Sequence, residues 1–215
     1  PASCPRPRSR SARDGDPARL RIVDLLLVGD ASPSELADQL GMPSNLLAHH
    51  LKVLDTAGVV YRQRSEGDRR RTYLRLATGA LEQPRTANLS PERVVFVCTA
   101  NSARSHLAAA LWRKASAIPS ASAGTHPAER IDPAAVDVAE RHQLPLRRLR
   151  PRHLDEVVAE GDLIVTVCDL AHEELGRLSR LHWSVPDPVA APSRAAFDDT
   201  VRELRCRITT LVAAS

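Results

Sequence analysis

The residues with the clearest chemistry form an eight-residue run from Cys98 to Ser105. This run reads Cys-Thr-Ala-Asn-Ser-Ala-Arg-Ser, follows the apolar stretch 94–97 and precedes a helix-like stretch. A loop between a strand and a helix N-terminus points its backbone N–H groups inward and so cradles a tetrahedral oxyanion. The spacing C-x5-R-S in this context therefore predicts a phosphate loop. The expected oxyanion contacts are Thr99, Ala100, Asn101, Ser102, Ala103 and Arg104.

Four side chains of this loop have distinct expected roles. The inward dipoles stabilise the thiolate of Cys98, which makes it a nucleophile at neutral pH. Arg104 clamps two oxygens of the anion with its planar guanidinium. Ser105 donates a hydrogen bond to the thiolate, and Asn101 fixes the loop through side-chain to backbone hydrogen bonds.

Two further residues could complete a catalytic site. Asp187 lies between two prolines and could protonate a leaving oxygen as a general acid, although Asp-Pro alone is a common turn. Cys168 follows the apolar run 163–167, and the carboxyl ends of parallel strands meet at one crevice. Its thiol could attack an intermediate on Cys98, or it could be a small buried apolar residue; the pattern leaves both interpretations open.

The segment around these residues alternates between strand and helix. We expect strands at 93–97 and 163–167 and helices at 105–117, 133–142, 171–178 and 195–212. Apolar strands separated by helices favour a parallel sheet that is covered on both faces. The sequence therefore predicts a three-layer α/β domain over residues 92–215.

The N-terminal part follows another pattern, that of a winged helix-turn-helix. Ser32-Pro33-Ser34-Glu35 offers a cap, a proline at the first helical position and an early carboxylate, and Ser44 offers a cap for the next helix. We expect a helix from near Pro17 that ends at Gly29, a second that is capped at Ser32 and stops at Gly41, and a third that is capped at Ser44 and closes at Gly58. A hairpin of strands at 59–64 and 71–76 should follow. The domain spans residues 17–76, between a disordered tail at 1–16 and a linker at 77–91.

This domain should bind double-stranded DNA. The second helix of the motif enters the major groove, where its N-terminal residues meet base edges. The residues in question are Ser44, Asn45, His49 and Lys52. Arginines of the hairpin would contact phosphates: Arg62, Arg64, Arg69, Arg70, Arg71 and Arg75. Residues 1–90 hold 14 Lys and Arg against 10 Asp and Glu, whereas residues 91–215 hold 16 of each, so the excess positive charge lies in the N-terminal part. The alternative interpretation of the hairpin arginines is a solvated basic surface that binds no DNA.

The remaining bulk features are those of a cytoplasmic protein without a membrane partner. No apolar run approaches the roughly 20 residues of a membrane span, and the opening 16 residues lack the apolar centre of a signal peptide. The four cysteines fit neither a disulfide framework nor a zinc knuckle, so we expect free thiols and no metal.

Residues 17–76 resemble the winged-helix regulators of the ArsR type. The resemblance lies in Asn-Leu-Leu-Ala-His-His-Leu-Lys-Val-Leu at 45–54 and Ala-Gly-Val-Val at 57–60. It implies a transcriptional regulator that binds DNA as a homodimer. Many such repressors sense metal or arsenite through cysteines near the helix-turn-helix, but here the helix at 35–40 has none, and Cys4 in the tail is the only thiol before the second domain.

Residues 92–212 resemble the low-molecular-weight tyrosine phosphatase fold and, within it, thioredoxin-type arsenate reductases. The resemblance lies in the phosphate loop and in the runs 122–125, 162–168, His182-Trp183 and Asp187-Pro188. It implies that Cys98 attacks arsenate, that Arg104 holds the oxygens and that Asp187 protonates a leaving hydroxide. Cys168 would then form a disulfide with Cys98 as arsenite departs.

The reductant and the activity have alternatives. The third relay cysteine of those reductases is missing, since Leu175 occupies its region and Cys206 lies in the last helix. We expect no bound cofactor and an external thiol reductant, either thioredoxin or mycothiol or glutathione with a redoxin. Phosphate is nearly isosteric with arsenate, so protein-tyrosine phosphatase activity is an alternative. Val189, where those phosphatases usually carry an aromatic residue, favours arsenate reduction for arsenic resistance. A third possibility is a non-catalytic oxyanion sensor that changes DNA affinity.

Overall fold

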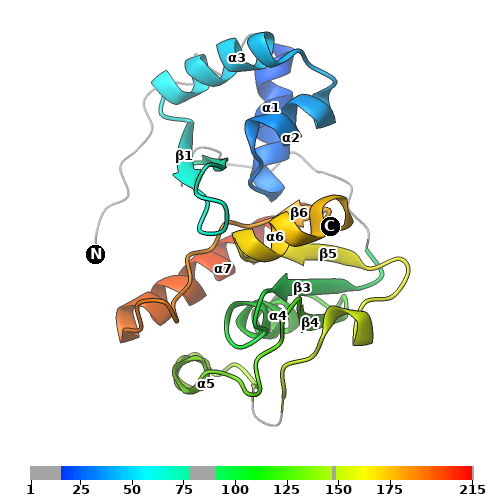
Figure 1. Cartoon of the computed structure of the whole chain (residues 1–215), viewed down its shortest axis with the longest axis vertical. Coiled ribbons are helices and arrows are strands. Elements are labelled where there is room, and N and C mark those ends of the chain that lie inside the picture. Colours follow the sequence, from blue (N-terminus) through cyan, green and yellow to red (C-terminus); the bar gives the residue numbers. More distant parts are fainter. Residues whose placement is uncertain (1–15, 78–90, 147–148, 215) are drawn as a thin grey trace. The chain divides into compact units, whose positions relative to one another are not determined.

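The computed structural model describes residues 16–77, 91–146 and 149–214 (Figure 1). The chain divides into two compact units, with residues 16–65 and 69–77 in the first and residues 91–214 in the second. The expected tail at 1–16 and linker at 77–91 lie outside the described residues, apart from Asp16, Ala77 and Pro91. No described helix combines the length and the apolar character that a membrane span needs.

The N-terminal unit has the expected order of three helices and a hairpin. Its elements are α1 (Pro17–Val28), α2 (Pro33–Leu40), α3 (Ser44–Thr56), β1 (Val60–Arg64) and β2 (Thr72–Leu76). The cap of α2 is the predicted one: Ser32 accepts from the backbone of Glu35, whose carboxylate accepts from the backbone of Ser32. Gly41 ends this helix at φ 60°, a left-handed conformation that glycine adopts at little cost. The prediction that Ser44 caps α3 was wrong, because Ser44 is the first helical residue and Pro43 precedes it without a side-chain cap.

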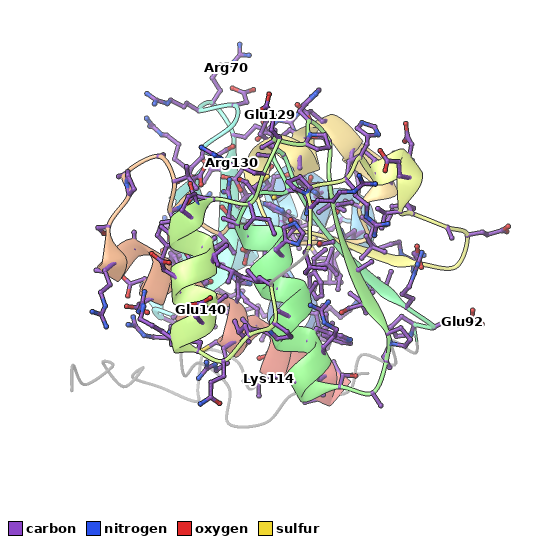
Figure 2. All side chains as sticks on the ribbon, turned by 90° about the horizontal axis from the view of Figure 1, so that it is seen from below. Arg70, Glu92, Lys114, Glu129, Arg130 and Glu140 are labelled. Carbon is purple, nitrogen blue, oxygen red and sulfur yellow. The ribbon has the colours of Figure 1, made fainter. Side chains whose placement is uncertain are left out.

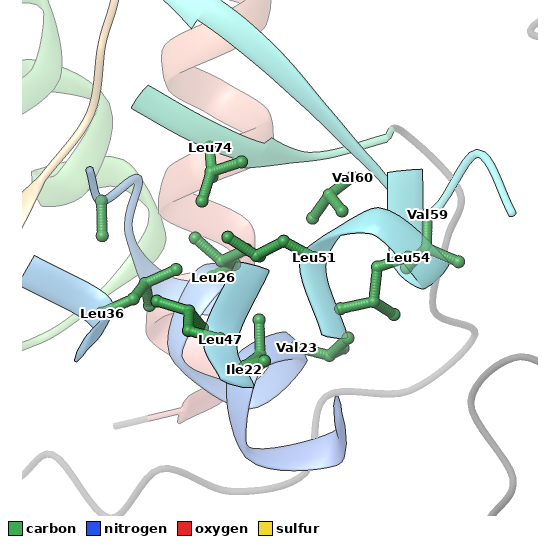
Figure 3. Packing of buried hydrophobic residues seen from close by; sticks show 11 residues of the cluster. Ile22, Val23, Leu26, Leu36, Leu47, Leu51, Leu54, Val59, Val60 and Leu74 are labelled. Carbon is green, nitrogen blue, oxygen red and sulfur yellow. The ribbon is translucent and has the colours of Figure 1, made fainter. Parts of the chain in front are cut away.

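The core of this unit lies between the three helices and the hairpin (Figure 3). Leucines three or four positions apart on α3 face inward, as the periodicity predicted: Leu47, Leu51 and Leu54 are each at most 2% exposed. They pack with Ile22 and Val23 of α1 in one apolar cluster. The opposite face of α3 is thereby left to solvent.

The C-terminal unit is an α/β domain with a parallel sheet. Its strands are β3 (Val94–Cys98), β4 (Ser120–Gly124), β5 (Leu163–Thr166) and β6 (Leu181–His182). Its helices are α4 (Arg104–Ala115), α5 (Pro133–Arg141), α6 (Asp169–Leu175) and α7 (Arg194–Ala214), with 3₁₀ turns η2 (Leu154–Glu156) and η3 (Gly176–Leu178). The helix expected at 171–178 thus begins two residues earlier and ends at Gly176, which has φ 52°.

The strand order is β4-β3-β5-β6, and every neighbouring pair is parallel. Since the chain leaves β3 toward β4 in one direction and β5 toward β6 in the other, right-handed crossovers place α4 and α6 on opposite faces (Figure 1). The covered parallel sheet is therefore confirmed. Lys114, labelled near the end of α4 in Figure 2, donates to the carbonyl of His142 just beyond α5 at 3.2 Å.

Aromatic side chains fill the centre of this domain. Phe96 on β3 lies with its ring centroid 6.0 Å from that of Trp112 on α4 and 5.7 Å from that of Trp183. All three rings are fully buried. Because β3 is central and buried throughout, its carboxyl end opens at the middle of the sheet edge, which is where Cys98 lies.

Candidate active site and DNA-binding surface

The phosphate loop connects the end of β3 to the start of α4. Cys98 is the last residue of the strand and Arg104 the first of the helix, so the loop is held at both ends by regular structure. The Sγ atom of Cys98 lies 3.1 Å from Oγ of Ser105, in the first turn of α4. This is the contact that a hydroxyl needs to stabilise a thiolate.

Asn101 holds the loop through two hydrogen bonds of its side chain, one within the loop and one to the backbone of another segment. Its backbone has φ 48°, and its side chain is fully buried. Asn101 Nδ2 donates to Ser105 Oγ at 2.8 Å, while Asn101 Oδ1 accepts from the backbone N–H of Arg152 at 2.9 Å. Asparagine tolerates the left-handed region better than most residues, and these bonds hold it there.

Gly124, at the end of β4, lets the neighbouring strand approach the loop. It stands opposite Cys98 in the parallel register. A Cβ atom on Gly124 would lie 2.6 Å from the carbonyl oxygen of Thr99 and 2.9 Å from Cβ of Asn101. No side chain fits here unless the backbone of the loop moves, so the run 122–125 has a steric role that its sequence alone did not reveal.

Arg104 is buried and points its guanidinium along the cleft. Nη1 donates to the carbonyl of Val185 at 2.9 Å, and Nη2 lies 3.1 Å from Oδ2 of Asp187. Burial opposes the charge, but the negative charges of Cys168, Cys98 and Asp187 raise the pKa of Arg104 above its usual value. The guanidinium is thus a permanent cation between the thiol and the acid.

Asp187 lies on the loop that follows β6 and reaches the phosphate loop through Arg104. Its Oδ1 accepts from the backbone N–H of Val189 at 3.1 Å, which fixes the side chain within its own turn. The side chain is 34% exposed and lines the same cleft as Cys98. The structure therefore brings the acid of one loop to the thiol and the cation of the phosphate loop.

Cys168 is at the N-cap of α6 and is only 2% exposed. Its Sγ atom lies 3.4 Å from Oγ1 of Thr99 in the phosphate loop. Burial, together with the charge of Cys98, raises the pKa of the Cys168 thiol to about 11, against the opposing charge of Arg104. The second thiol is therefore beside the first and protonated at neutral pH.

The cleft of this domain is lined mainly by the phosphate loop and the start of α6. Its lining residues in the domain are Cys98, Thr99, Ala100, Ser102, Ala103, Arg104, Cys168, Asp169, Leu170, Asp187 and Val189. No aromatic side chain is among the described residues that line it. Cys206 is exposed on α7 and is not a lining residue.

A match to a family model identifies the family of the chain. The model for low molecular weight phosphotyrosine protein phosphatases matches residues 93–214. The chain belongs to this family. A second family model, for bacterial regulatory proteins of the arsR family, matches residues 16–62. The protein thus joins an ArsR-type DNA-binding domain to a domain of the low molecular weight phosphotyrosine protein phosphatase family.

Several solved structures are similar to the phosphatase-fold domain. An arsenate reductase from Archaeoglobus fulgidus DSM 4304 is 30% identical, over 55% of this chain and 98% of that chain, with a TM-score of 0.47. The tyrosine phosphatase Wzb from Escherichia coli K30 is 21% identical, over 57% and 97%, with a TM-score of 0.51. The tyrosine phosphatase AmsI from Erwinia amylovora is 21% identical, over 60% and 97%, also with a TM-score of 0.51. The two phosphatases share the fold. None of the curated proteins matches the chain.

Two residues near the phosphatase-family site escaped the sequence analysis. Asp169 directly follows Cys168 and is buried. Its Oδ1 accepts a hydrogen bond from His182 Nε2 at 3.0 Å. Although burial acts to raise the pKa of Asp169, hydrogen bonds from His182 and Ser184 lower it below its usual value. His106, in the first turn of α4, is buried as well. Neither belongs to a spacing pattern, so only the tertiary structure could reveal them.

In the ArsR-type domain, the predicted base-reading residues lie on the solvent face of α3. Ser44, Asn45, His49 and Lys52 are all exposed. Asn45 Oδ1 accepts from the backbone N–H of Leu46 at 2.9 Å, which orients the amide at the start of the helix. His50, by contrast, is buried with Nδ1 3.3 Å from Oδ2 of Asp16, so only one of the two adjacent histidines faces solvent.

Five of the six hairpin arginines are exposed, namely Arg62, Arg64, Arg69, Arg70 and Arg71. Arg75 is an exception, and its assignment to a phosphate-contacting surface was wrong. Its Nε lies 3.4 Å from Oδ2 of Asp30, and both side chains are buried. Arg75 also stacks over the ring of Tyr61 at 5.5 Å, so it stabilises the hairpin from within.

Proposed function

We propose that this protein is a DNA-binding transcriptional regulator joined to an arsenate reductase that serves arsenic resistance. The observation that carries the reductase is the second thiol, since Cys168 Sγ lies 3.4 Å from Thr99 Oγ1 and lines the same cleft as Cys98. A phosphatase needs no second thiol, because water hydrolyses the phosphocysteine. A disulfide-forming reductase does need one.

The first step is the attack of the Cys98 thiolate on the arsenic atom of dihydrogen arsenate. A sulfur–arsenic bond forms and one arsenic–oxygen bond breaks. The departing hydroxide takes a proton from the carboxylic acid form of Asp187 and leaves as water, and Asp187 is left as a carboxylate that takes up a proton from solvent before the next turnover. Arg104 and the loop N–H groups hold the remaining oxygens throughout. The product is a monoanionic arsenyl group on Cys98.

The second step transfers two electrons to arsenic. The Cys168 thiol gives its proton to solvent, and its thiolate attacks Sγ of Cys98. A disulfide forms between the two sulfurs, and the electron pair of the sulfur–arsenic bond stays on arsenic, which leaves as arsenite. Arsenylation converts the Cys98 thiolate into a bonded sulfur and moves its negative charge to the arsenyl oxygens, which Arg104 and the loop N–H groups hold. The charge on the Cys98 sulfur, which raises the pKa of Cys168, is then gone.

An external thiol must then reduce the disulfide. Thioredoxin would do so by exchange at one of the two sulfurs, without any cofactor bound to the protein. In a second route, mycothiol or glutathione attacks the arsenylated Cys98 and a redoxin resolves the mixed disulfide. Cys206 is exposed on α7 and serves as an intramolecular relay in neither route.

Protein-tyrosine phosphatase activity is the competing function. The ion pair of Arg104 with Asp187 beside Cys98 would suit a phosphate ester equally well. Such an enzyme, however, benefits from aromatic side chains that sandwich the phenol ring, and the described cleft residues include none. We therefore rank phosphatase activity second.

The deciding experiment compares arsenate reduction and p-nitrophenyl phosphate hydrolysis in the wild type, Cys168→Ser and Cys206→Ser. For the intramolecular route we expect Cys168→Ser to abolish thioredoxin-linked turnover, and Cys206→Ser to retain it. Non-reducing mass analysis after one turnover should find a Cys98–Cys168 disulfide. A mixed disulfide on Cys98 would instead support the external thiol.

Two other results would defeat the reductase. Fast aryl-phosphate hydrolysis that persists in Cys168→Ser, with no arsenate-dependent oxidation of either thiol, would indicate that the domain is a phosphatase. Oxyanion binding without any turnover, coupled to a change in DNA affinity, would indicate a sensor.

For the ArsR-type domain we propose binding to an operator as a homodimer, since closed twofold dimers are the commonest oligomers and match the symmetry of palindromic DNA. Sedimentation of the full chain with and without an operator fragment measures the stoichiometry. A single chain per duplex would contradict this proposal.

A further inference from the structure

Asp169 is a carboxylate of the cleft that the chemistry described above does not use. It directly follows Cys168 as the first residue of α6, lines the same cleft and is 3% exposed. Its Oδ1 lies 3.0 Å from Nε2 of His182, the last residue of β6, and both side chains are buried. A buried carboxylate keeps its charge only where a neighbour pairs with it, so the contact with His182 fixes the place of this side chain.

The imidazole of His182 contacts the chain on both sides of Cys168. Its Nδ1 lies 3.0 Å from Oγ1 of Thr166, two residues before Cys168, while its Nε2 contacts Asp169, one residue after Cys168. Thr166 is the last residue of β5 and is fully buried. Because each nitrogen of the rigid ring has its own partner, His182 bridges the end of β5 to the start of α6. Cys168 lies in the turn that this bridge spans.

The bridging imidazole is itself held by the sheet and by α6. His182 stands opposite Thr166 in the parallel pairing of β6 with β5, and the backbone N–H of Trp183 donates to the carbonyl of Thr166 at 2.8 Å. The ring also stacks on that of His172, with centroids 4.1 Å apart and planes 10° apart. The bridge is therefore anchored to regular structure at both of its ends.

The second step of the proposed reaction depends on where Cys168 is held. Its sulfur must approach Cys98 Sγ along the line opposite the sulfur–arsenic bond, and the rate of such an attack falls steeply when a reacting atom is displaced. A thiol makes only weak hydrogen bonds, so the contact of Cys168 with Thr99 at 3.4 Å holds the sulfur loosely. The backbone on either side of Cys168 must then set the position of the thiol.

The acid loop after β6 has an anchor of its own. Arg104 donates to the carbonyl of Val185 at 2.9 Å and lies 3.1 Å from Asp187. Loss of the contact between Asp169 and His182 should therefore displace the second thiol more than the general acid or the bound oxyanion.

We propose that Asp169 and His182 are a positioning pair of the second thiol, which holds Cys168 for its attack on Cys98. The inference rests on the proposed disulfide-forming reduction of arsenate. Loss of the pair slows the formation of the disulfide and leaves the binding of the oxyanion intact. General damage to the fold would impair both, so the two measurements together separate a positioning role from an ordinary structural one.

The experiment follows one turnover of the full chain with saturating arsenate and no added reductant, and measures the Cys98–Cys168 disulfide over time by non-reducing mass analysis. In the same variants, the protection of Cys98 from iodoacetamide by inorganic phosphate gives the affinity for the anion. For Asp169→Ala we expect disulfide formation about tenfold slower than in the wild type, the order of one lost hydrogen bond, with the phosphate dissociation constant within about twofold. Asp169→Asn keeps an oxygen that accepts from His182 and should stay within about threefold of the wild-type rate.

Asp198→Ala is the matched control. Asp198 Oδ1 lies at the same 3.0 Å from Nε2 of another histidine, His142, and neither residue lines the cleft. This variant should therefore form the disulfide at the wild-type rate.

Thr166→Val removes the other contact of the imidazole with little change in volume, and provides the test if Asp169→Ala does not fold. We again expect disulfide formation about tenfold slower and an unchanged affinity for phosphate. An unchanged rate in Thr166→Val or in folded Asp169→Ala, an equal loss in Asp198→Ala, or a parallel loss of phosphate affinity would overturn the proposal. A wild type that forms no Cys98–Cys168 disulfide with arsenate would instead defeat the proposed intramolecular reduction, so the two failures are distinguishable.

Discussion

We expect Cys168 to be nearly inert toward alkylation in the resting protein and to gain reactivity when the charge on Cys98 is removed. Burial and that charge raise the pKa of Cys168 to about 11. At pH 8 the thiolate fraction is then about one in a thousand, compared with about one in four for a free thiol of pKa ~8.5. Alkylation of Cys168 should therefore rise about tenfold per pH unit up to pH ~10.

The assay is iodoacetamide labelling between pH 6 and 11, with each cysteine peptide quantified by mass spectrometry. Cys206 is exposed on α7 and serves as an internal control. In Cys98→Ser the neighbouring charge is absent, so the Cys168 profile should shift to lower pH, although burial and the contact with Thr99 remain.

Two results would refute this reasoning. If the labelling rate of Cys168 in the wild type levels off below pH 9, burial and the charge of Cys98 do not keep this thiol protonated. Identical Cys168 profiles in the wild type and in Cys98→Ser would mean that the two sulfurs are not electrostatically coupled. In the second case, arsenylation of Cys98 could not activate Cys168 in the way we propose.

Three further changes have defined outcomes. Gly124→Ala should destabilise the domain by roughly 1–3 kcal/mol in denaturant unfolding and weaken oxyanion protection, because its Cβ would lie 2.6 Å from the Thr99 carbonyl; equal stability would contradict the close approach. His106 is neutral when folded, with a pKa of about 4 against ~6.5 when unfolded, so its contribution is complete above pH ~6.5 and is lost toward pH 4. Between pH 7 and 4 the wild type should lose about 3 kcal/mol more than His106→Asn, and parallel pH profiles would rule this out. Charge reversal at Arg69, Arg70 and Arg71 in the full chain should weaken binding to all DNA sequences alike and lower the salt slope by about 0.9 per lost contact, whereas an unchanged slope would remove these arginines from the interface.

Local patterns in the sequence were sufficient for the helix-turn-helix and for the phosphate loop. Ser32 and Glu35 form their capping box from a spacing of three residues, and Leu47 and Leu51 bury one face of α3. The spacing of Cys98 and Arg104 across the junction of a strand and a helix is also a pattern among residues that are close together in the sequence. Where only neighbouring residues decide a conformation, the sequence is enough to predict it.

Two strands were missed because they lack a local signal. β4 reads Ser-Ala-Ser-Ala-Gly, which has no large apolar residue, and β6 is two residues long. Both are strands because β3 and β5 offer them unpaired backbone groups at the edges of the sheet. The assignment of Arg75 failed for a related reason, since its burial depends on Asp30, 45 positions away in the sequence.

Only the tertiary structure brought the reacting groups together. Sequence indicated Cys98, Cys168 and Asp187 as separate candidates, and left Cys168 and Asp187 open to ordinary structural interpretations. The parallel pairing of β3 with β5 puts both cysteines at one sheet edge, and the loop after β6 brings Asp187 to Arg104 at 3.1 Å. The burial that raises the pKa of Cys168 and the close approach at Gly124 exist only in the packed domain, because they depend on atoms that lie far apart along the chain.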